Sequence, residues 1–167
     1  KSLEHYLASE LLQLSEHDIY IDIANANSPT PEIYKELFGC KVYRQDLAFP
    51  DGINGNIIGG DASKMPVKDG FATKMALHCS FEHFENELDI SFIKEASRVL
   101  NKGGKLCILP LYLYKDYSIE TNPYYLTKEA ITFESDAKLF CVKNKKARHC
   151  RFYDIHNLIN RIKNNAS

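Results

Sequence analysis

The hydrophobic positions at the start of the chain predict a helix, a strand and a second helix. Apolar residues first recur at the spacing of an amphipathic helix, at Leu3, Tyr6, Leu7, Leu11 and Leu14. Residues 18–24 instead alternate and are rich in β-branched side chains, which is typical of a strand. The second helix is expected to open at Thr30, a candidate N-cap that precedes Pro31 at the first helical position, and to end at Gly39.

The middle of the chain continues this alternation of strands and helices. Residues 41–45 form a second predicted strand, which ends at Asp46, and residues 71–77 form a third. The segment between them, residues 51–60, contains four glycines and is expected to form a loop rather than a helix.

A third helix is expected to be capped by Asp89 and ended by the glycines at 103–104. Its apolar face consists of Phe92, Ile93, Ala96, Val99 and Leu100. Residues 105–113 are almost continuously apolar, which predicts a strand covered on both faces.

The pattern weakens after this strand. Residues 114–136 are rich in tyrosine and irregular, and we interpret them as an insertion or lid. Residues 138–143 predict a short strand, and Asp154 is expected to cap a final helix. The apolar side of that helix consists of Ile155, Leu158, Ile159 and Ile162.

This succession of strands and helices indicates an α/β fold with right-handed crossovers and helices on both faces of a parallel sheet. We therefore predict one domain over residues 1–167 with a Rossmann-like, doubly wound and mostly parallel sheet. Ligands of such sheets bind at the carboxyl ends of the strands. The candidate site residues are those that follow the strands, at 24–28, 46, 61–62 and 78–83.

Composition narrows the class of protein. The 167 residues are 44% hydrophobic and 26% charged, which excludes a disordered or collagenous chain. A net charge of -1 gives no reason to expect nucleic acid or an anionic membrane as partner. The longest apolar run, residues 106–114, is too short to span a bilayer, and no secretory leader is recognisable. The five cysteines form no CxxC pair, so we expect a reduced, cytoplasmic protein.

Three stretches resemble the class I S-adenosylmethionine-dependent methyltransferases of the small-molecule type. Residues 60–71, GDASKMPVKDGF, are similar to the family's segment "GDA..LPF.D..FD". Residues 95–106, EASRVLNKGGKL, are similar to "E..RVLKPGG.L", and residues 80–84, SFEHF, resemble the element that follows the fourth strand. Their order and spacing agree over residues 18–113. The family fold normally ends in an antiparallel hairpin, and the sequence shows none after the helix expected from Asp154.

The resemblance implies S-adenosylmethionine as cofactor and assigns residues to it. In the family a strand with an acidic residue, here Asp22, precedes a GxGxG loop. The glycine positions hold Ala24, Ala26 and Ser28, which are small, and Asn25 tolerates left-handed backbone angles. The loop is therefore expected to cradle the amino-acid end of the cofactor, and the acid is expected to orient the loop.

The other implied cofactor contacts lie after the later strands. Asp46 matches the carboxylate that accepts from both ribose hydroxyls, and Asp61 with Ala62 matches the pair that meets adenine. A solvated loop acid and an Asx turn are the alternatives at these positions. His78 is expected to contact the cofactor as well. The helix that usually precedes Asp61 in the family is expected to be reduced to a loop.

Catalytic candidates follow the fourth strand, where the acceptor would meet the methyl group. They are His78, Glu82 and His83. Methyl transfer depends mainly on proximity and orientation, and a hydroxyl acceptor adds a need for a general base, which histidine supplies. The alternative for His83 is a packing residue at a helix start. No metal site is expected, because the pairs at 78–79 and 149–150 lack the usual ligand spacing.

The sequence thus predicts a methyltransferase that acts on a small-molecule acceptor, and a binding or scaffold domain that has lost the cofactor is the main alternative. A nicotinamide-dependent reductase fits less well because GxGxxG is absent. A basic run is interpreted as a solvated face rather than an anion site, and consists of Lys143, Lys145, Lys146, Arg148 and Arg151. Several tyrosines could line an acceptor pocket or form the body of a lid: Tyr112, Tyr114, Tyr117, Tyr124 and Tyr125. The oligomeric state is not readable.

Overall fold

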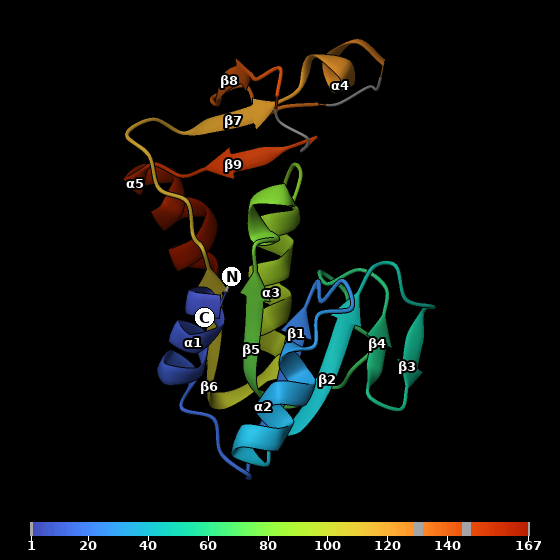
Figure 1. Cartoon of the computed structure of the whole chain (residues 1–167). Coiled ribbons are helices and arrows are strands. Elements are labelled where there is room, and N and C mark those ends of the chain that lie inside the picture. Colours follow the sequence, from blue (N-terminus) through green and yellow to red (C-terminus); the bar gives the residue numbers. More distant parts are fainter. Residues whose placement is uncertain (1, 129–131, 145–147, 167) are drawn as a thin grey trace. The chain divides into compact units, whose positions relative to one another are not determined.

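A computed structural model describes residues 2–128, 132–144 and 148–166 (Figure 1). Residues 129–131 of the expected insertion and two lysines of the basic run, Lys145 and Lys146, lie outside these ranges. The chain divides into two compact units. The first comprises Lys1–Cys79 and Phe92–Pro110, and the second comprises Ser80–Ser91 and Leu111–Ser167.

The first unit is built on a mostly parallel six-stranded sheet with the order β3-β4-β2-β1-β5-β6. The strands are β1 (Ile19–Ile23), β2 (Lys41–Asp46), β3 (Gly52–Asn54), β4 (Ile57–Gly59), β5 (Ala72–His78) and β6 (Leu100–Leu109). All neighbouring pairs are parallel except β3 and β4, which are antiparallel. The predicted α/β class with a Rossmann-like sheet is confirmed.

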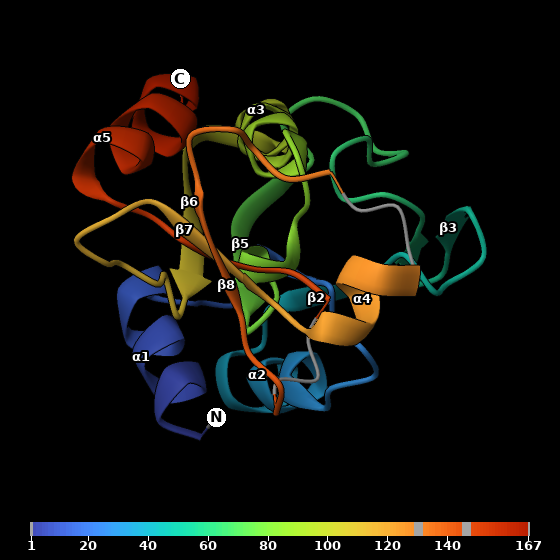
Figure 2. The same ribbon diagram turned by 90° about the horizontal axis from the view of Figure 1, so that it is seen from above.

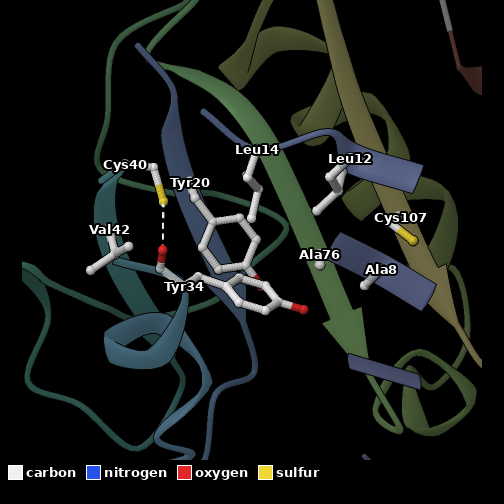
Figure 3. Close-up of a cluster of buried hydrophobic side chains, with 9 residues drawn as sticks. All are labelled: Ala8, Leu12, Leu14, Tyr20, Tyr34, Cys40, Val42, Ala76 and Cys107. Carbon is white, nitrogen blue, oxygen red and sulfur yellow. Dashed lines mark hydrogen bonds between the residues drawn. The ribbon is translucent and has the colours of Figure 1, made fainter. Parts of the chain in front are cut away.

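Helices cover both faces of this sheet. Figure 2 shows α1 (Ser2–Leu12) and α2 (Thr30–Phe38) on one side and α3 (Leu88–Val99) on the other. The first two helices bury side chains against β1, β2, β5 and β6 in the cluster drawn in Figure 3, which consists of Ala8, Leu12, Leu14, Tyr20, Tyr34, Cys40, Val42, Ala76 and Cys107. The tyrosine rings of β1 and α2 meet edge to face with centroids 5.2 Å apart. The expected apolar face of α3 is buried at Phe92, Ile93, Ala96 and Val99.

Several local predictions in the first unit need correction. Thr30 is the first residue of α2 rather than its cap, because Pro29 takes the N-cap position without a side-chain bond. Residues 51–60 form the β3–β4 hairpin, since Gly55 (φ 61°) permits a tight turn between isoleucine-containing strands. The glycines at 103–104 do not end α3. Leu100 already belongs to β6, and Gly103 (φ 82°) lies where the β5–β6 register shifts. The predicted helix end at Gly39 (φ 71°) is confirmed.

The second unit carries a small sheet with the order β8-β7-β9. Its strands are β7 (Ser118–Thr121), β8 (Lys138–Cys141) and β9 (Cys150–Phe152), with β8 parallel and β9 antiparallel to β7. Its helical segments are η1 (Phe81–His83), the first residues of α3, α4 (Pro123–Lys128), α5 (Ile155–Asn157), η2 (Leu158–Ile162) and η3 (Lys163–Asn165).

The sequence pattern was less informative for this unit. Within the segment expected to be irregular, residues 118–121 form β7 and residues 123–128 form α4, and β9 is a strand that the sequence pattern does not predict. The expected cap of the final helix is confirmed, since Asp154 Oδ1 accepts a hydrogen bond from the Asn157 N–H at 2.7 Å.

The interior of the second unit contains a network of buried charges. Asp89 and Arg151 are fully buried, with Arg151 Nη1 3.0 Å from Asp89 Oδ2. The Asp89 carboxylate also accepts from the Tyr153 hydroxyl at 2.8 Å and from Arg161 Nη2 at 2.7 Å, and Arg151 bonds Glu134 as well. Asp89 therefore lies inside the first turn of α3 as an ion-pair residue rather than as a helix cap. The interpretation of Arg151 as part of a solvated face is wrong.

No helix within the described ranges is long and apolar enough to cross a membrane.

Candidate functional site

The loop after β1 adopts the backbone that glycine takes freely, although it contains none. Ala24 (φ 52°), Ala26 (φ 48°) and Asn27 (φ 61°) all lie in the left-handed region. This conformation costs an alanine about 1–2 kcal/mol relative to the right-handed one. Such strain persists only where surrounding contacts enforce it, and it concentrates at functional sites.

The contacts that enforce the loop come from the end of β2. The Ala24 N–H donates to Gln45 Oε1 at 3.3 Å, and the Asn25 N–H donates to the Gln45 carbonyl oxygen at 2.9 Å. The Ala26 N–H donates to Asp46 Oδ2 at 2.7 Å. Sequence reasoning missed Gln45, whose only signal was its place beside Asp46. This side chain also donates to the Gly60 carbonyl oxygen at 2.6 Å and thus links two of the loops at this edge.

Asp22 holds the same loop through a hydrogen bond to Asn25. Its carboxylate is buried and accepts hydrogen bonds from the Tyr20 hydroxyl at 2.8 Å and from Asn25 Nδ2 at 2.6 Å. Burial raises the pKa of Asp22 to about 6, although these two hydrogen bonds oppose the shift. The acid therefore holds Asn25 in place and changes its protonation state near pH 6.

Asp46 and Asp61 lie at the carboxyl edge of the sheet, as predicted, but both carboxylates already accept hydrogen bonds from backbone N–H groups. Asp46 Oδ1 accepts from the Ala48 N–H at 2.9 Å, in addition to the bond from Ala26. Asp61 Oδ1 accepts from the Ser63 N–H at 2.8 Å, which is the Asx turn considered above, while its carboxylate remains exposed. Ala62 is buried beside it. A ligand hydroxyl at Asp46 would have to share or displace these bonds.

His78 ends β5 and lies next to Asp22, with its Nε2 atom 3.8 Å from Asp22 Oδ1. Its ring also contacts the ring of His5 from α1, with centroids 4.2 Å apart. Burial lowers the pKa of His78 to about 4, so the ring is neutral near pH 7 and its contact with Asp22 is not an ion pair there. Sequence reasoning missed His5, because its position in an amphipathic helix gave no sign of the site.

Polar atoms at this site are buried without a partner. Within the part of the chain that the structure describes, Asn25 Oδ1 and both ring nitrogens of His78 form no hydrogen bond. A buried polar atom without a partner is costly, and in a native protein it points to a ligand or water. An acceptor at Asn25 and a donor-acceptor ring at His78 suit a group with both ammonium and carboxylate, so the residues fit the amino-acid end of S-adenosylmethionine.

Glu82 and His83 belong to the second unit, where η1 places them side by side. Glu82 is buried, and its Oε1 atom lies 3.8 Å from Nε2 of His83, whose side chain is 46% exposed. The Nδ1 atom of His83 bonds the carbonyl oxygen of His149 at 2.6 Å. The structure thus brings together the predicted residues of the first unit around the β1 loop, and separately joins His83 to a histidine that the sequence analysis considered only as a metal ligand.

Comparisons with known proteins agree with this architecture. A family model described as a methyltransferase domain matches residues 21–108. The PH0226 protein of Pyrococcus horikoshii OT3 is 23% identical, with a TM-score of 0.53, over 62% of this chain and 52% of that one. The YcgJ protein of Bacillus subtilis is 15% identical, with a TM-score of 0.57, over 68% and 52%.

A third similar structure is geranyl diphosphate C-methyltransferase from Streptomyces coelicolor A3(2), solved with Mg²⁺, geranyl diphosphate and S-adenosyl-L-homocysteine. It is 16% identical, with a TM-score of 0.54, over 74% of this chain and 48% of that one. The chain spans about half the length of these three structures, and no curated protein matches it. The family model covers more than half of the chain, from β1 to β6, and the chain therefore belongs to the methyltransferase domain family.

Proposed function

We propose that this chain binds S-adenosylmethionine and transfers its methyl group to a small-molecule acceptor. The observation that carries the proposal is the loop at 24–28, which is held in glycine-like geometry next to buried, unpartnered polar atoms at Asn25 and His78. A fold alone does not fix an activity, so the proposal rests on this site in addition to membership of the family.

The bound cofactor would supply a methyl group already activated on a sulfonium. The chain's own residues would bind the cofactor and orient it. Asn25 Oδ1 would accept from the ammonium, and His78 would face the carboxylate. The exposed carboxylate of Asp61, next to the buried Ala62, would accept from the adenine amine, and Asp46 would serve the ribose by giving up one of its two backbone bonds.

Asp22 adds a proton-coupled element to this site. Because burial raises its pKa to about 6, a cationic ammonium nearby would favour the ionised form and release a proton on binding. The affinity for the cofactor is therefore expected to fall as the pH drops below about 6.

His83 is proposed as the general base for a hydroxyl acceptor. It follows β5 closely in the sequence, and its side chain is 46% exposed, with Nε2 3.8 Å from Glu82 Oε1. Proton removal by a placed histidine is worth about 10²–10⁴-fold in rate. We expect His83→Ala to lower turnover by about 10²-fold and to leave cofactor affinity unchanged. A loss of cofactor affinity instead would make His83 a packing residue.

A scaffold that has lost the cofactor is the second candidate, and one observation favours it. Both oxygens of Asp46 are already bonded to backbone N–H groups, one of them in the strained loop. If a ligand cannot displace either of these hydrogen bonds, Asp46 cannot accept from the ribose hydroxyls.

Calorimetric titration with S-adenosylhomocysteine separates the two candidates. A functional site should give micromolar binding, a free energy of about 8 kcal/mol. Asp61→Ala should weaken this binding by about 1–3 kcal/mol through loss of charge-assisted hydrogen bonds. Asp69→Ala is the matched control, because Asp69 is exposed and pairs with Arg98. Absence of binding at millimolar ligand would leave the scaffold, and label transfer from S-adenosylmethionine to a pool of hydroxylated small molecules would identify the acceptor class.

A further inference from the structure

Two segments of the second unit hold each other through several consecutive residues. One is the chain from Glu82 to Asn86, which includes the end of η1, and the other is residues 148–151 at the start of β9. Arg148 Nε donates to Glu85 Oε1 at 2.7 Å. Arg151 donates to the carbonyl oxygens of Phe84 and Asn86 at 2.7 and 2.8 Å. The short helix that carries His83 is therefore fixed by residues more than sixty positions later in the sequence.

Two histidines join these segments by reciprocal hydrogen bonds. The Nδ1 atom of His83 lies 2.6 Å from the carbonyl oxygen of His149, and the Nδ1 atom of His149 lies 3.1 Å from the carbonyl oxygen of Glu82. A carbonyl oxygen only accepts, so each Nδ1 must carry the proton. In the neutral form each ring is thereby held in the tautomer whose Nε2 has a free lone pair.

The two rings differ in what surrounds Nε2. His149 is 2% exposed, its Nε2 has no partner among the described residues, and burial lowers its pKa. It therefore stays neutral and cannot exchange protons freely with solvent. The side chain of His83 is 46% exposed, so this ring is open to a molecule in solution, and its Nε2 lies 3.8 Å from Glu82 Oε1. Only one of the two rings is placed to take a proton.

We infer that His149 is a positioning residue, which holds η1 through the Glu82 carbonyl so that His83 presents an unprotonated Nε2. This inference rests on the proposed function, in which His83 is the base. A packing role alone would not require the outer ring to keep a defined tautomer, because an exposed histidine is free to rotate and to exchange its tautomers. The function of His149 is thus to act through His83 and not on the substrate.

The charged groups around the two rings define what a pH profile would report. Glu82 Oε1 lies 3.8 Å from Nε2 of His83. His149 is influenced by Arg151, Glu134 and Glu85, in addition to its bond with Glu82. Arg151 disfavours a positive charge on His149, while the two carboxylates favour it.

The test compares two substitutions of His149 in the full chain. Asn places an N–H donor close to the position of Nδ1, so His149→Asn retains the bond to the Glu82 carbonyl, whereas His149→Leu removes it. Nitrogen NMR of labelled histidine is expected to show His83 as the Nδ1–H tautomer in the wild type and in His149→Asn. In His149→Leu we expect a mixture that favours Nε2–H. His156→Leu, which replaces an exposed histidine of the same unit, should change nothing at His83.

Methyl transfer provides the second measurement. His149→Leu is expected to lower kcat by about tenfold or more and to leave KM for S-adenosylmethionine unchanged. His149→Asn should restore most of the rate. An Nε2–H tautomer at His83 in the wild type, or one unaffected by His149→Leu, would overturn the inference. If the chain binds no S-adenosylhomocysteine, the proposed function fails, and the tautomer result still decides whether His149 controls the His83 ring.

Discussion

The two units of this chain are stabilised by different kinds of contact. The first buries a cluster of apolar and tyrosine side chains between its helices and sheet. The second has fully buried Arg151 and Asp89 in its interior, together with Arg161 and Tyr153. Apolar burial is non-directional and tolerates small shifts, whereas buried ion pairs stabilise only when every charge keeps its partner. The second unit should therefore be the more sensitive to loss of one group.

Removal of the central carboxylate should have the largest effect. Asp89→Ala leaves Arg151 and Arg161 to share the carboxylate of Glu134, so one positive charge in the interior is uncompensated. This is expected to cost about 3–5 kcal/mol in the free energy of unfolding of the second unit. Hydrogen exchange of the β7 and β9 amides measures this directly, because it reports each unit separately.

The matched control for this variant is Asp69→Ala. Asp69 also pairs with an arginine, at 2.7 Å from Arg98, but its side chain is 83% exposed. An exposed pair contributes about 0–1 kcal/mol. If Asp89→Ala lowered the free energy of unfolding by no more than Asp69→Ala does, the interior network would not stabilise the second unit.

A core truncation in the first unit should rank next. Leu12 is 1% exposed and belongs to the apolar cluster, so Leu12→Ala should cost about 3 kcal/mol through lost burial and the cavity that remains. The adjacent Leu11 is 59% exposed, and Leu11→Ala should change stability by about 0.5 kcal/mol or less. Denaturant unfolding of the pair measures the difference, and similar values would mean that α1 does not pack as described.

The same contrast explains what the sequence could and could not predict. Periodicity and turn residues located α1, β1, α2, β2 and β5. The face predicted to be buried on α1 was wrong, because Leu3, Tyr6, Leu7 and Leu11 are exposed while Ala8 and Leu12 are buried. Periodicity failed in the second unit, where Arg151 looks like a surface residue and Asp89 like a helix cap until their pairing is known. That pairing joins residues far apart in the sequence, and no local pattern encodes it.

The candidate site was predictable to the extent that chain position determines it. Asp22 lies near the end of β1, Asp46 ends β2 and Asp61 follows β4, so topology places them at one edge of the sheet. The contribution of His5 and Gln45 depends on how α1 and β2 pack, and that of His149 depends on a contact with η1. These side chains carry no motif, and only tertiary structure reveals them.

The first unit should also contain two opposed pH dependences. Burial raises the pKa of Asp22 from 3.8 to about 6, so its carboxylate lowers stability as the pH rises through this window. Burial lowers the pKa of His78 from 6.5 to about 4, so this ring lowers stability as the pH falls from 6.5 toward 4. At about 1.4 kcal/mol per pKa unit, each effect amounts to about 3 kcal/mol, and because they are opposed the two largely cancel.

Single substitutions separate these effects. Asp22→Asn should leave a chain that loses stability only on acidification, and His78→Gln should leave one that loses it only as the pH rises from about 4 to 6. Urea unfolding of the ligand-free chain between these pH values measures both slopes. His17→Gln is the control, since that ring is 86% exposed. Parallel curves for wild type and both variants would contradict the assigned burial.

The smallest expected effect concerns the strained loop of the first unit. Ala26 has φ 48°, and Ala26→Gly removes a left-handed penalty of about 1–2 kcal/mol while adding a backbone entropy cost of about 0.5–1 kcal/mol. The net result should be a gain of about 0.5–1 kcal/mol in the free energy of unfolding. Ala48→Gly in a neighbouring loop has no such penalty to relieve, so thermal unfolding should show a loss there. A loss in both variants would mean that the loop is not strained. A gain in Ala26→Gly alone would show that Ala26 is strained. The hydrogen bond from the Ala26 N–H to Asp46 would then hold alanine in a turn that glycine adopts without that contact.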